Sequence, residues 1–245
     1  MLLEVKDLCL NIDKKQILSS VSFCVEKGDF AVLCGRNGAG KSQLLKIIKG
    51  LRKQSSGSIF ISGQDLSRDR GERMKRIALV FQNADLQAVG ETVEKDVAFG
   101  PENLGWDRKR IKERTDQVIS LLGLEEKRHQ RPATLSGGEK RKLAIAGTLA
   151  MDPDIILLDE PFVALDYPSV RTVLSSLVSL HRKGHTILIV SHEIEKFLAH
   201  ATRLLILKEG KITCQGRPED CLDELREAEV YLPDLPFKEL TWLTT

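Results

Sequence analysis

The chain has 245 residues, of which 42% are hydrophobic and 29% charged, a composition typical of one large globular domain or of a core with an inserted subdomain. Its formal net charge of +2 gives no electrostatic reason to expect a nucleic-acid partner or an anionic membrane surface. Apolar runs fall short of the roughly 20 residues that cross a bilayer, and Glu4, Lys6 and Asp7 interrupt the first apolar stretch, so we expect neither a membrane-spanning helix nor a signal peptide.

The N-terminal part of the chain is expected to be mostly strand. Short runs that are apolar throughout, or that alternate with polar residues, predict strands over 2–12, 20–29, 30–35, 57–66 and 76–82. Between them, apolar residues recur at helical spacing up to Gly50, which predicts a helix over 41–50.

The middle of the chain changes character, because helical spacing replaces alternation from about residue 89 to 131. Asp107 is expected to cap a helix there, and Gly123 to end it. Its apolar face is expected to consist of Ile111, Val118, Ile119 and Leu122. A further helix is predicted to end near Met151. We therefore predict a helical subdomain, about 89–150, inserted in the main domain.

The C-terminal part alternates between strand and helix. Its patterns predict a strand over 154–160, a helix over 169–184 and a strand over 185–192. Strands that alternate with helices imply an α/β fold with a mainly parallel sheet. Residues from about 216 to 245 are first acidic and then punctuated by proline, and we expect them to form a short irregular appendage.

The five cysteines are odd in number and show no C-x-x-C spacing. They are Cys9, Cys24, Cys34, Cys214 and Cys221. We expect them to be small buried hydrophobic residues in a reducing environment, rather than metal ligands or disulfide partners.

Residues 35–42 fit the phosphate-loop pattern G-x-x-x-x-G-K-[ST], with a predicted strand before them and a predicted helix after them. The loop consists of Gly35, Arg36, Asn37, Gly38, Ala39, Gly40, Lys41 and Ser42. Its glycines let backbone amides wrap a phosphate chain, and the helix N-terminus adds positive potential. Lys41 is expected to reach the β and γ phosphates and Ser42 to bind Mg²⁺. The alternative is a plain glycine-rich turn.

Two carboxylates stand at the carboxyl end of a predicted buried strand, where open α/β sheets bind their ligands. Asp159 is expected to hold Mg²⁺, directly or through a water, and Glu160 to act as the general base on the attacking water. The alternative is a structural pair that caps the turn at Pro161. A phosphate loop in the same chain favours the catalytic interpretation.

Two more predicted strands end in polar side chains. Gln82 is expected to reach Mg²⁺ or the attacking water, and His192 to sense the γ-phosphate. A histidine after a strand is usually structural. Here, however, four strand ends would converge on one phosphate, which favours a catalytic role for both residues.

The stretch LSGGE places a serine and two glycines where a helix is expected to begin. Its residues are Leu135, Ser136, Gly137, Gly138 and Glu139. Backbone amides at a helix N-terminus suit an anion. An ordinary helix start would explain Ser136 but not the paired glycines, which weaken a helix. No catalytic constellation or metal cluster stands beside it in sequence, so the segment alone identifies neither the anion nor the rest of the site.

Together these motifs resemble those of the ATP-binding-cassette ATPases. They are GRNGAGKS, VFQ, LSGGE, ILLDEP, ALD and SH, in this order within residues 1–215. The resemblance implies a P-loop NTPase with a mainly parallel core sheet, an N-terminal antiparallel β subdomain and the inserted helical subdomain, with ATP and Mg²⁺ as ligands. It also implies that LSGGE binds the γ-phosphate of ATP held by a second ATPase subunit, and that Asp166 links the two sites.

Two longer stretches resemble a narrower group, the energy-coupling factor ATPases of vitamin and cobalt or nickel importers. They are VFQNADLQAVGETVEKDVAFGPENLGW and KRKLAIAGTLAMDPDIILLDEP. This resemblance implies an ATP hydrolase at the cytoplasmic face of the cell membrane, with a like or similar second ATPase subunit, a transmembrane scaffold subunit and a substrate-binding membrane subunit. The scaffold would dock near Gln82 and the helical subdomain. The apolar candidates there are Leu86, Val89, Val93 and Phe99.

The sequence departs from the family at two positions and leaves two alternatives. Ile12 stands where the family usually stacks adenine on an aromatic ring, so we expect dispersion contact without stacking. Phe162 stands where the family prefers threonine. One alternative is an exporter ATPase with the same core. The other is a soluble cassette ATPase of DNA repair or ribosomes, but the chain has neither the long coiled coil of the first class nor the two cassettes of the second.

Overall fold

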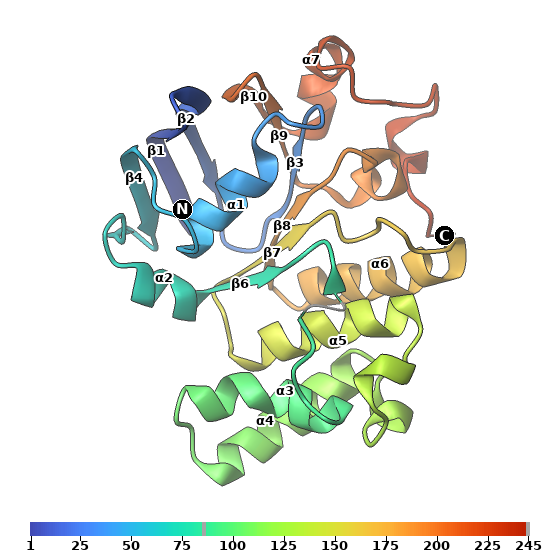
Figure 1. The fold of residues 1–245 in the computed structure, drawn as a ribbon. Helices are drawn as coiled ribbons and strands as arrows, with labels where there is room; N and C mark the ends of the chain where they lie inside the picture. Colours follow the sequence, from blue (N-terminus) through green and yellow to red (C-terminus); the bar gives the residue numbers. More distant parts are fainter. Residues whose placement is uncertain (85–86, 244–245) are drawn as a thin grey trace.

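The computed structural model describes residues 1–84 and 87–243, which form two sheets with helices packed around them (Figure 1). The strands are β1 (Leu3–Ile12), β2 (Lys15–Val25), β3 (Phe30–Cys34), β4 (Ser56–Ile61), β5 (Gln64–Asp65), β6 (Ile77–Val80), β7 (Ile155–Asp159), β8 (Thr186–Val190), β9 (Arg203–Lys208) and β10 (Lys211–Gly216). The α-helices are α1 (Lys41–Lys49), α2 (Arg70–Arg76), α3 (Val93–Asn103), α4 (Arg108–Leu121), α5 (Gly137–Ala150), α6 (Tyr167–Arg182) and α7 (Leu222–Glu227). Short 3-10 helices are η2 (Glu125–Lys127), η3 (Pro132–Thr134), η4 (Ile194–Lys196), η5 (Leu198–His200), η6 (Pro218–Cys221) and η7 (Phe237–Glu239). Within the two described ranges, no helix is both long and apolar enough to cross a membrane.

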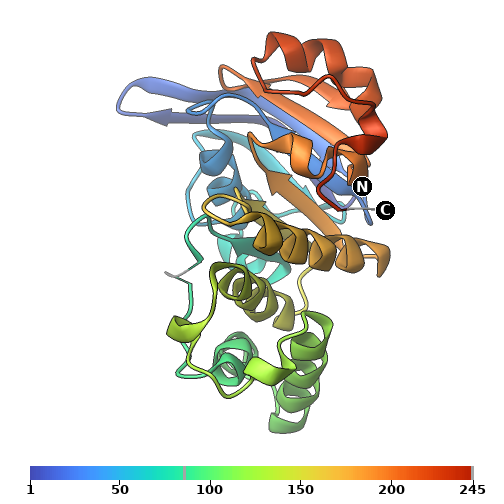
Figure 2. The ribbon, with the colours of Figure 1, turned by 90° about the vertical axis from the view of Figure 1, so that its right-hand side faces the viewer.

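The larger sheet has the strand order β10-β9-β3-β8-β7-β6, with β10 antiparallel at one edge and the other neighbours parallel. All residues of β3, β7 and β8 are buried, as expected for strands that are covered on both faces. Alternate residues of β3 enter two different cores. Phe30 and Val32 pack with the apolar residues of α5 and α6, whereas Ala31 and Leu33 pack with α1 and the smaller sheet. Figure 2 shows the resulting layers, from the C-terminal segment and the N-terminal hairpin near the top to α3 and α4 at the bottom.

The smaller sheet is antiparallel, with the order β2-β1-β4-β5, which confirms the predicted N-terminal β subdomain. At the tip of the first hairpin, Ile12 pairs with Lys15. Asp13 and Lys14 make the turn with φ values of 47° and 66°, the left-handed conformation of two-residue hairpin loops. The hairpin therefore ends with Ile12 beside a tight turn.

The helical layer holds α3, α4 and α5, which pack on one another below α6 (Figure 1). The Asp107 carboxylate caps α4 by accepting a hydrogen bond from the Arg110 N–H at 3.0 Å, as predicted. The helix ends at Leu121, and Gly123 follows with a φ of 61°, also as predicted. Val118, Ile119 and Leu122 are buried, which confirms three of the four expected apolar residues, whereas Ile111 is half-buried.

Among the strands and α-helices, α2, β9, β10 and α7 were not predicted, whereas β5 lies within the stretch predicted over 57–66. The seven residues of α2 include one large apolar side chain, the exposed Met74, so no apolar periodicity marks the helix. β9 is a short apolar run, RLLILK. In a run of this length, hydrophobic periodicity does not distinguish a buried strand from a buried segment of helix.

The expectation of five unpaired cysteines is wrong for two of them. Cys214 and Cys221 form a disulfide, with Cα atoms 6.3 Å apart. β10 ends at Gly216 and the chain turns back through η6, which brings the two residues together although their spacing matches no short motif. Cys9, Cys24 and Cys34 are free.

Candidate nucleotide-binding and hydrolysis site

The phosphate loop connects the buried end of β3 to the start of α1, as predicted. Gly40 precedes the helix with a φ of 103°, in the left-handed region that favours glycine. A Cβ atom at Gly40 would lie 2.8 Å from Leu18 Cδ2, inside van der Waals contact. Glycine is therefore required at this position both for the backbone conformation and for the close approach of β2.

Lys41 lies inside the loop and is 6% exposed. Its Nζ donates hydrogen bonds to the carbonyl oxygens of Gly35 at 2.6 Å and Arg36 at 3.0 Å. Burial lowers the pKa of Lys41, and the nearby negative charge of Glu160 opposes that shift. Because water screens a buried cation poorly, this ammonium group can attract a phosphate more strongly than a surface lysine can.

Ser42 and Asp159 meet from two different strand ends. The Ser42 hydroxyl donates a hydrogen bond to Asp159 Oδ1 at 3.0 Å. Burial raises the pKa of Asp159, and the hydrogen bond from Ser42 opposes that shift. A hydroxyl beside a carboxylate fits Mg²⁺, which prefers oxygen ligands and takes few from the protein when phosphates supply the others. Within the described residues, no group of three or more His, Cys, Asp or Glu residues could hold a metal ion by itself.

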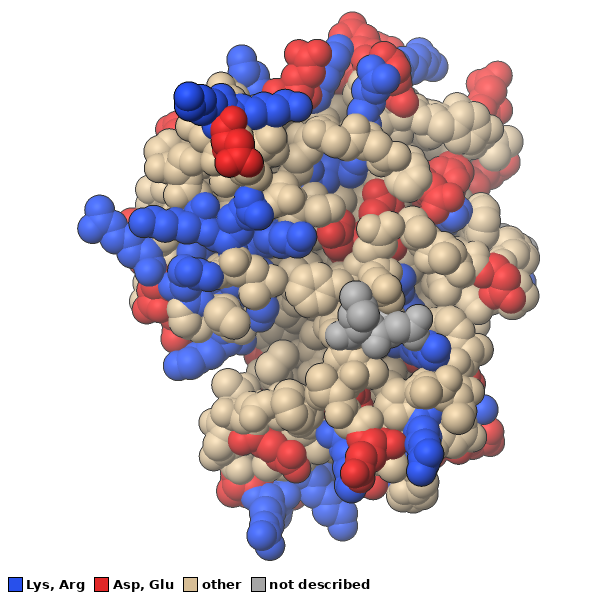
Figure 3. Space-filling model, viewed as in Figure 1, with Lys and Arg blue, Asp and Glu red and all other residues tan. Residues whose placement is uncertain are grey.

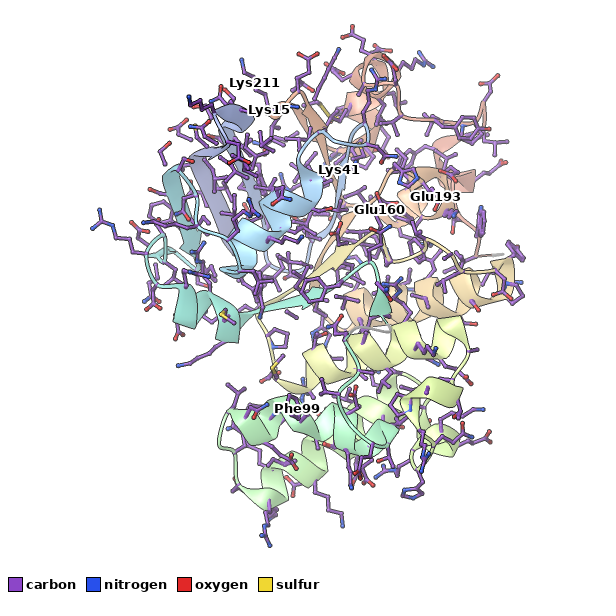
Figure 4. All side chains as sticks on the ribbon, viewed as in Figure 1. Lys15, Lys41, Phe99, Glu160, Glu193 and Lys211 are labelled. Carbon is purple, nitrogen blue, oxygen red and sulfur yellow. A yellow bond between two sulfur atoms is a disulfide. The ribbon has the colours of Figure 1, made fainter. Side chains whose placement is uncertain are left out.

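Glu160 is the first residue after β7 and is held in place from β8. Its φ of 48° is uncommon for a residue other than glycine, and its N–H donates to the Val190 carbonyl at 2.8 Å. The Ser191 hydroxyl donates to Glu160 Oε2 at 2.9 Å, and His192 Nδ1 lies 2.8 Å from Oε1. A strained backbone conformation persists only where the surrounding structure holds it in place, and such residues are concentrated at active sites. Figure 4 shows Glu160 close to Lys41, where the ends of β7 and α1 meet.

One cleft of about 740 Å³ joins these groups. The predicted site residues that line it are Ile12, Asn37, Gly38, Gly40, Lys41, Ser42, Gln82, Glu160 and His192. The four predicted strand ends therefore do converge. Gln82 is exposed at the cleft, and its carbonyl oxygen accepts a hydrogen bond from Arg141 Nη2 at 2.7 Å.

Several other cleft residues were not predicted from sequence. Phe162, noted only as a departure from the family pattern, is buried against Phe197 with ring centroids 5.2 Å apart. Ile17 lines the cleft beside Ile12, from the facing strand of the hairpin. Glu193 and Lys196 line the cleft from the turn after β8. An apolar residue near a hairpin tip and charged residues after a strand are common, so no sequence signal marked them.

The LSGGE segment begins α5 with a complete capping box. The Glu139 N–H donates to Ser136 Oγ at 3.3 Å, and the Ser136 N–H donates to Glu139 Oε2 at 2.8 Å. A Cβ at Gly138 would lie 2.9 Å from the Ser169 side chain, so glycine is also needed for the close packing of α5 on α6. Among the described residues that line the nucleotide cleft, none belongs to 135–139.

Asp166 is the N-cap of α6, and its carboxylate accepts a hydrogen bond from the Ser169 N–H at 3.1 Å. The same helix start contacts the LSGGE segment, because Gly137 and Gly138 lie against Leu165 and Ser169. The LSGGE segment therefore packs against the start of α6 and against Leu165, which itself lines the cleft.

Comparison with known proteins identifies the class. Residues 18–163 match the family model described as ABC transporter. The energy-coupling factor transporter ATP-binding protein EcfA2 of Methanospirillum hungatei is 37% identical over 241 residues, which cover 96% of this chain and 61% of that protein. The cobalt import ATP-binding protein CbiO of Syntrophus aciditrophicus is 39% identical over 239 residues, which cover 95% of this chain and 85% of that protein.

A solved structure agrees with these relatives. It is described as CbiO1 from Clostridium perfringens, part of the ABC transporter complex CbiONQ, and it matches with a TM-score of 0.84 and 30% identity over 95% of this chain and 96% of that one. The chain belongs to the ABC transporter family of ATP-binding proteins. The predicted P-loop ATPase fold and the resemblance to the energy-coupling factor group are both confirmed.

We expect Ile12→Tyr to tighten ATP binding by about two- to tenfold. Ile12 lines the cleft beside the phosphate loop, and an aromatic ring there would add stacking of about 0.5–1.5 kcal/mol to the existing contact area. A fluorescence or calorimetric titration measures the change. Lys112→Tyr, at an exposed position of α4 and outside the cleft, is the control. Unchanged or weaker affinity in Ile12→Tyr would show that another residue contacts the base.

Proposed function

We propose that this chain is the ATP-binding and ATP-hydrolysing subunit that energises a membrane importer of the energy-coupling factor type, for a vitamin or a transition-metal ion. The observation that carries the hydrolytic part is the cleft in which a buried lysine, a serine–aspartate pair and a glutamate–histidine pair meet. The names of the relatives, one of them a cobalt import protein, favour import over export.

The predicted polar residues of the site have proposed roles in hydrolysis. The amides of the phosphate loop and the Lys41 ammonium group would bind the β and γ phosphates. Ser42, Asp159 and Gln82 would hold Mg²⁺, which when bound neutralises phosphate charge. Glu160 would take a proton from the attacking water, and His192 would contact the γ-phosphate while it orients Glu160.

We further propose that the LSGGE segment completes the site of a second ATPase subunit. It lines no part of its own chain's described cleft, yet it presents amides at the start of a 14-residue helix, and such a helix end binds anions. Two chains arranged head to tail would place Ser136 of one against the ATP held by Lys41 of the other. Asp166, which lies against the LSGGE helix, would then connect the two sites.

The membrane scaffold subunit is proposed to dock on an apolar groove of the helical layer, from where it would hold the chain at the cytoplasmic face of the membrane. The groove measures about 290 Å³ and includes Val89, Phe99, Leu104 and Met151. Val89 is 60% exposed and Phe99 is 46% exposed, so both can contact a partner, and Figure 4 shows Phe99 on α3. Of the other predicted docking residues, Val93 is fully buried in the core, and Leu86 lies outside the described residues.

Phe99→Glu is expected to abolish co-purification with membrane proteins and to leave the isolated chain folded. A charge in an apolar interface has to be desolvated without a partner, whereas on a free surface it costs little. The measurement is recovery of the membrane complex from detergent extracts, together with the melting temperature of the isolated chain. Leu235→Glu, a matched change at a 50% exposed residue of the C-terminal segment, should leave assembly intact. Complex assembly at the parental level in Phe99→Glu would argue against this docking site.

A further inference from the structure

The C-terminal segment reaches the wall of the nucleotide cleft. Lys196, which lines the cleft, is 6% exposed, and its Nζ pairs with Glu193 at 2.7 Å. The same Nζ lies 4.7 Å from the ring centroid of Trp242, within the range of a cation–π contact. The backbone N–H of Trp242 also donates a hydrogen bond to the backbone carbonyl of Lys196 at 2.9 Å. Trp242 therefore holds both the side chain and the backbone of a cleft residue.

The other neighbour of Trp242 is the start of α6. The ring centroids of Trp242 and Tyr167 are 5.1 Å apart. Tyr167 is the first residue of α6 and directly follows Asp166, the residue proposed to connect the two ATP sites. One aromatic side chain thus contacts two segments that are distant in sequence, one after β7 and one after β8.

Further hydrogen bonds attach the C-terminal segment to the turn after β8. The Ala199 N–H donates to the Leu240 carbonyl at 3.0 Å, and His200 Nε2 lies 2.8 Å from the Thr241 hydroxyl. This turn, residues 193–200, begins directly after His192 and consists of two short 3-10 helices, η4 and η5. Because such short helices make few backbone hydrogen bonds of their own, the position of the turn depends on what packs against it.

We propose that Trp242 is a positioning residue for ATP hydrolysis. By packing between Lys196 and Tyr167, it fixes the turn after His192 relative to the start of α6, so that His192 and Asp166 keep the placement that hydrolysis requires. The proposal rests on the ATPase function proposed above. Trp242 does not line the described cleft, so it acts through its neighbours.

Steady-state ATP hydrolysis by the full chain tests the proposal. Trp242→Ala should lower kcat by about two- to tenfold, the range that the loss of one aromatic pair produces. The KM for ATP should stay near the parental value, because Trp242 packs on Lys196 and Tyr167 and does not line the cleft in which Ile12 and the phosphate loop lie. Trp242→Phe keeps a ring against Tyr167 and should recover most of the lost kcat. If Trp242→Ala does not fold, Trp242→Leu provides the same comparison with Trp242→Phe.

A double-mutant cycle separates positioning from a general loss of stability. If Trp242 acts through the start of α6, adding Tyr167→Ala to Trp242→Ala should lower kcat little further, because both changes remove the same contact. Trp106→Ala is the matched control, since Trp106 packs on Arg110 at 3.6 Å in the helical layer, away from the cleft. Parental kcat in Trp242→Ala, or an equal loss in Trp106→Ala, would overturn the positioning role alone. Hydrolysis by the parental chain that does not depend on Lys41 would instead overturn the proposed function.

Discussion

Lys41→Ala is expected to abolish ATP hydrolysis and to weaken ATP binding. The Lys41 ammonium group is the buried cation of the phosphate loop, held by two loop carbonyls that lie within 3.0 Å. Alanine removes that charge from a poorly screened site, where one lost electrostatic contact to the reacting group typically costs about 10²–10³ in rate. Phosphate release by the purified chain, or by its membrane complex, measures the loss.

The matched control for this change is Lys15→Ala. Lys15 is an exposed lysine of β2 that does not line the cleft, and Figure 4 shows it on the N-terminal hairpin. Hydrolysis by Lys15→Ala should be unaltered, which excludes a general effect of lost positive charge. Steady hydrolysis at the parental rate in Lys41→Ala would refute the phosphate-loop assignment, and the proposed ATPase function with it.

Glu160→Gln is expected to stop the cycle after ATP binding. The amide has the size of the carboxylate and can still accept the hydrogen bond from Ser191, but it cannot take a proton from water. Loss of a general base typically lowers the rate by about 10²–10⁴-fold. ATP affinity should be kept or raised, because a negative charge near the γ-phosphate is removed. Single-turnover hydrolysis and equilibrium ATP binding, measured on the same sample, separate the two effects.

Glu126→Gln, at an exposed glutamate of η2, is the control for this substitution and should hydrolyse ATP normally. Two outcomes would contradict the role of Glu160. One is hydrolysis near the parental rate in Glu160→Gln, which would mean that another group activates the water. The other is loss of ATP binding, which would make Glu160 a binding residue rather than a base.

The fold was predicted best where the sequence has a strict pattern or a specific end signal. The continuous apolar runs of β3, β7 and β8 are buried on both faces, and Asp107 and Gly123 mark the two ends of α4. Where neither signal exists, prediction failed. The polar helix α2 has no apolar face, and the link between Cys214 and Cys221 follows from a chain reversal that short spacing rules do not describe.

The site was predictable as far as its residues belong to local motifs. Parallel strands place their carboxyl ends at one edge, so Gln82, Glu160 and His192 could be expected beside the phosphate loop before any coordinates were known. The contacts that orient these groups are different in kind. The Ser191 hydroxyl on Glu160 and the packing of Trp242 on Lys196 join residues far apart in the chain, and no pattern within one segment encodes them.

The central claim is that each ATP lies between Lys41 of one chain and Ser136 of another. Its most direct test is the size of Glu160→Gln in solution, with ATP and Mg²⁺ and without nucleotide, alone and combined with Ser136→Arg. The membrane complex is tested alongside, because a different second subunit could complete the site. We expect ATP to convert the single variant to a dimer. Ser136→Arg should prevent this, whereas Ser175→Arg, on the exposed face of α6, should not. A dimer that still forms with ATP in the presence of Ser136→Arg, together with normal hydrolysis by a chain carrying Ser136→Arg alone, would contradict the shared site.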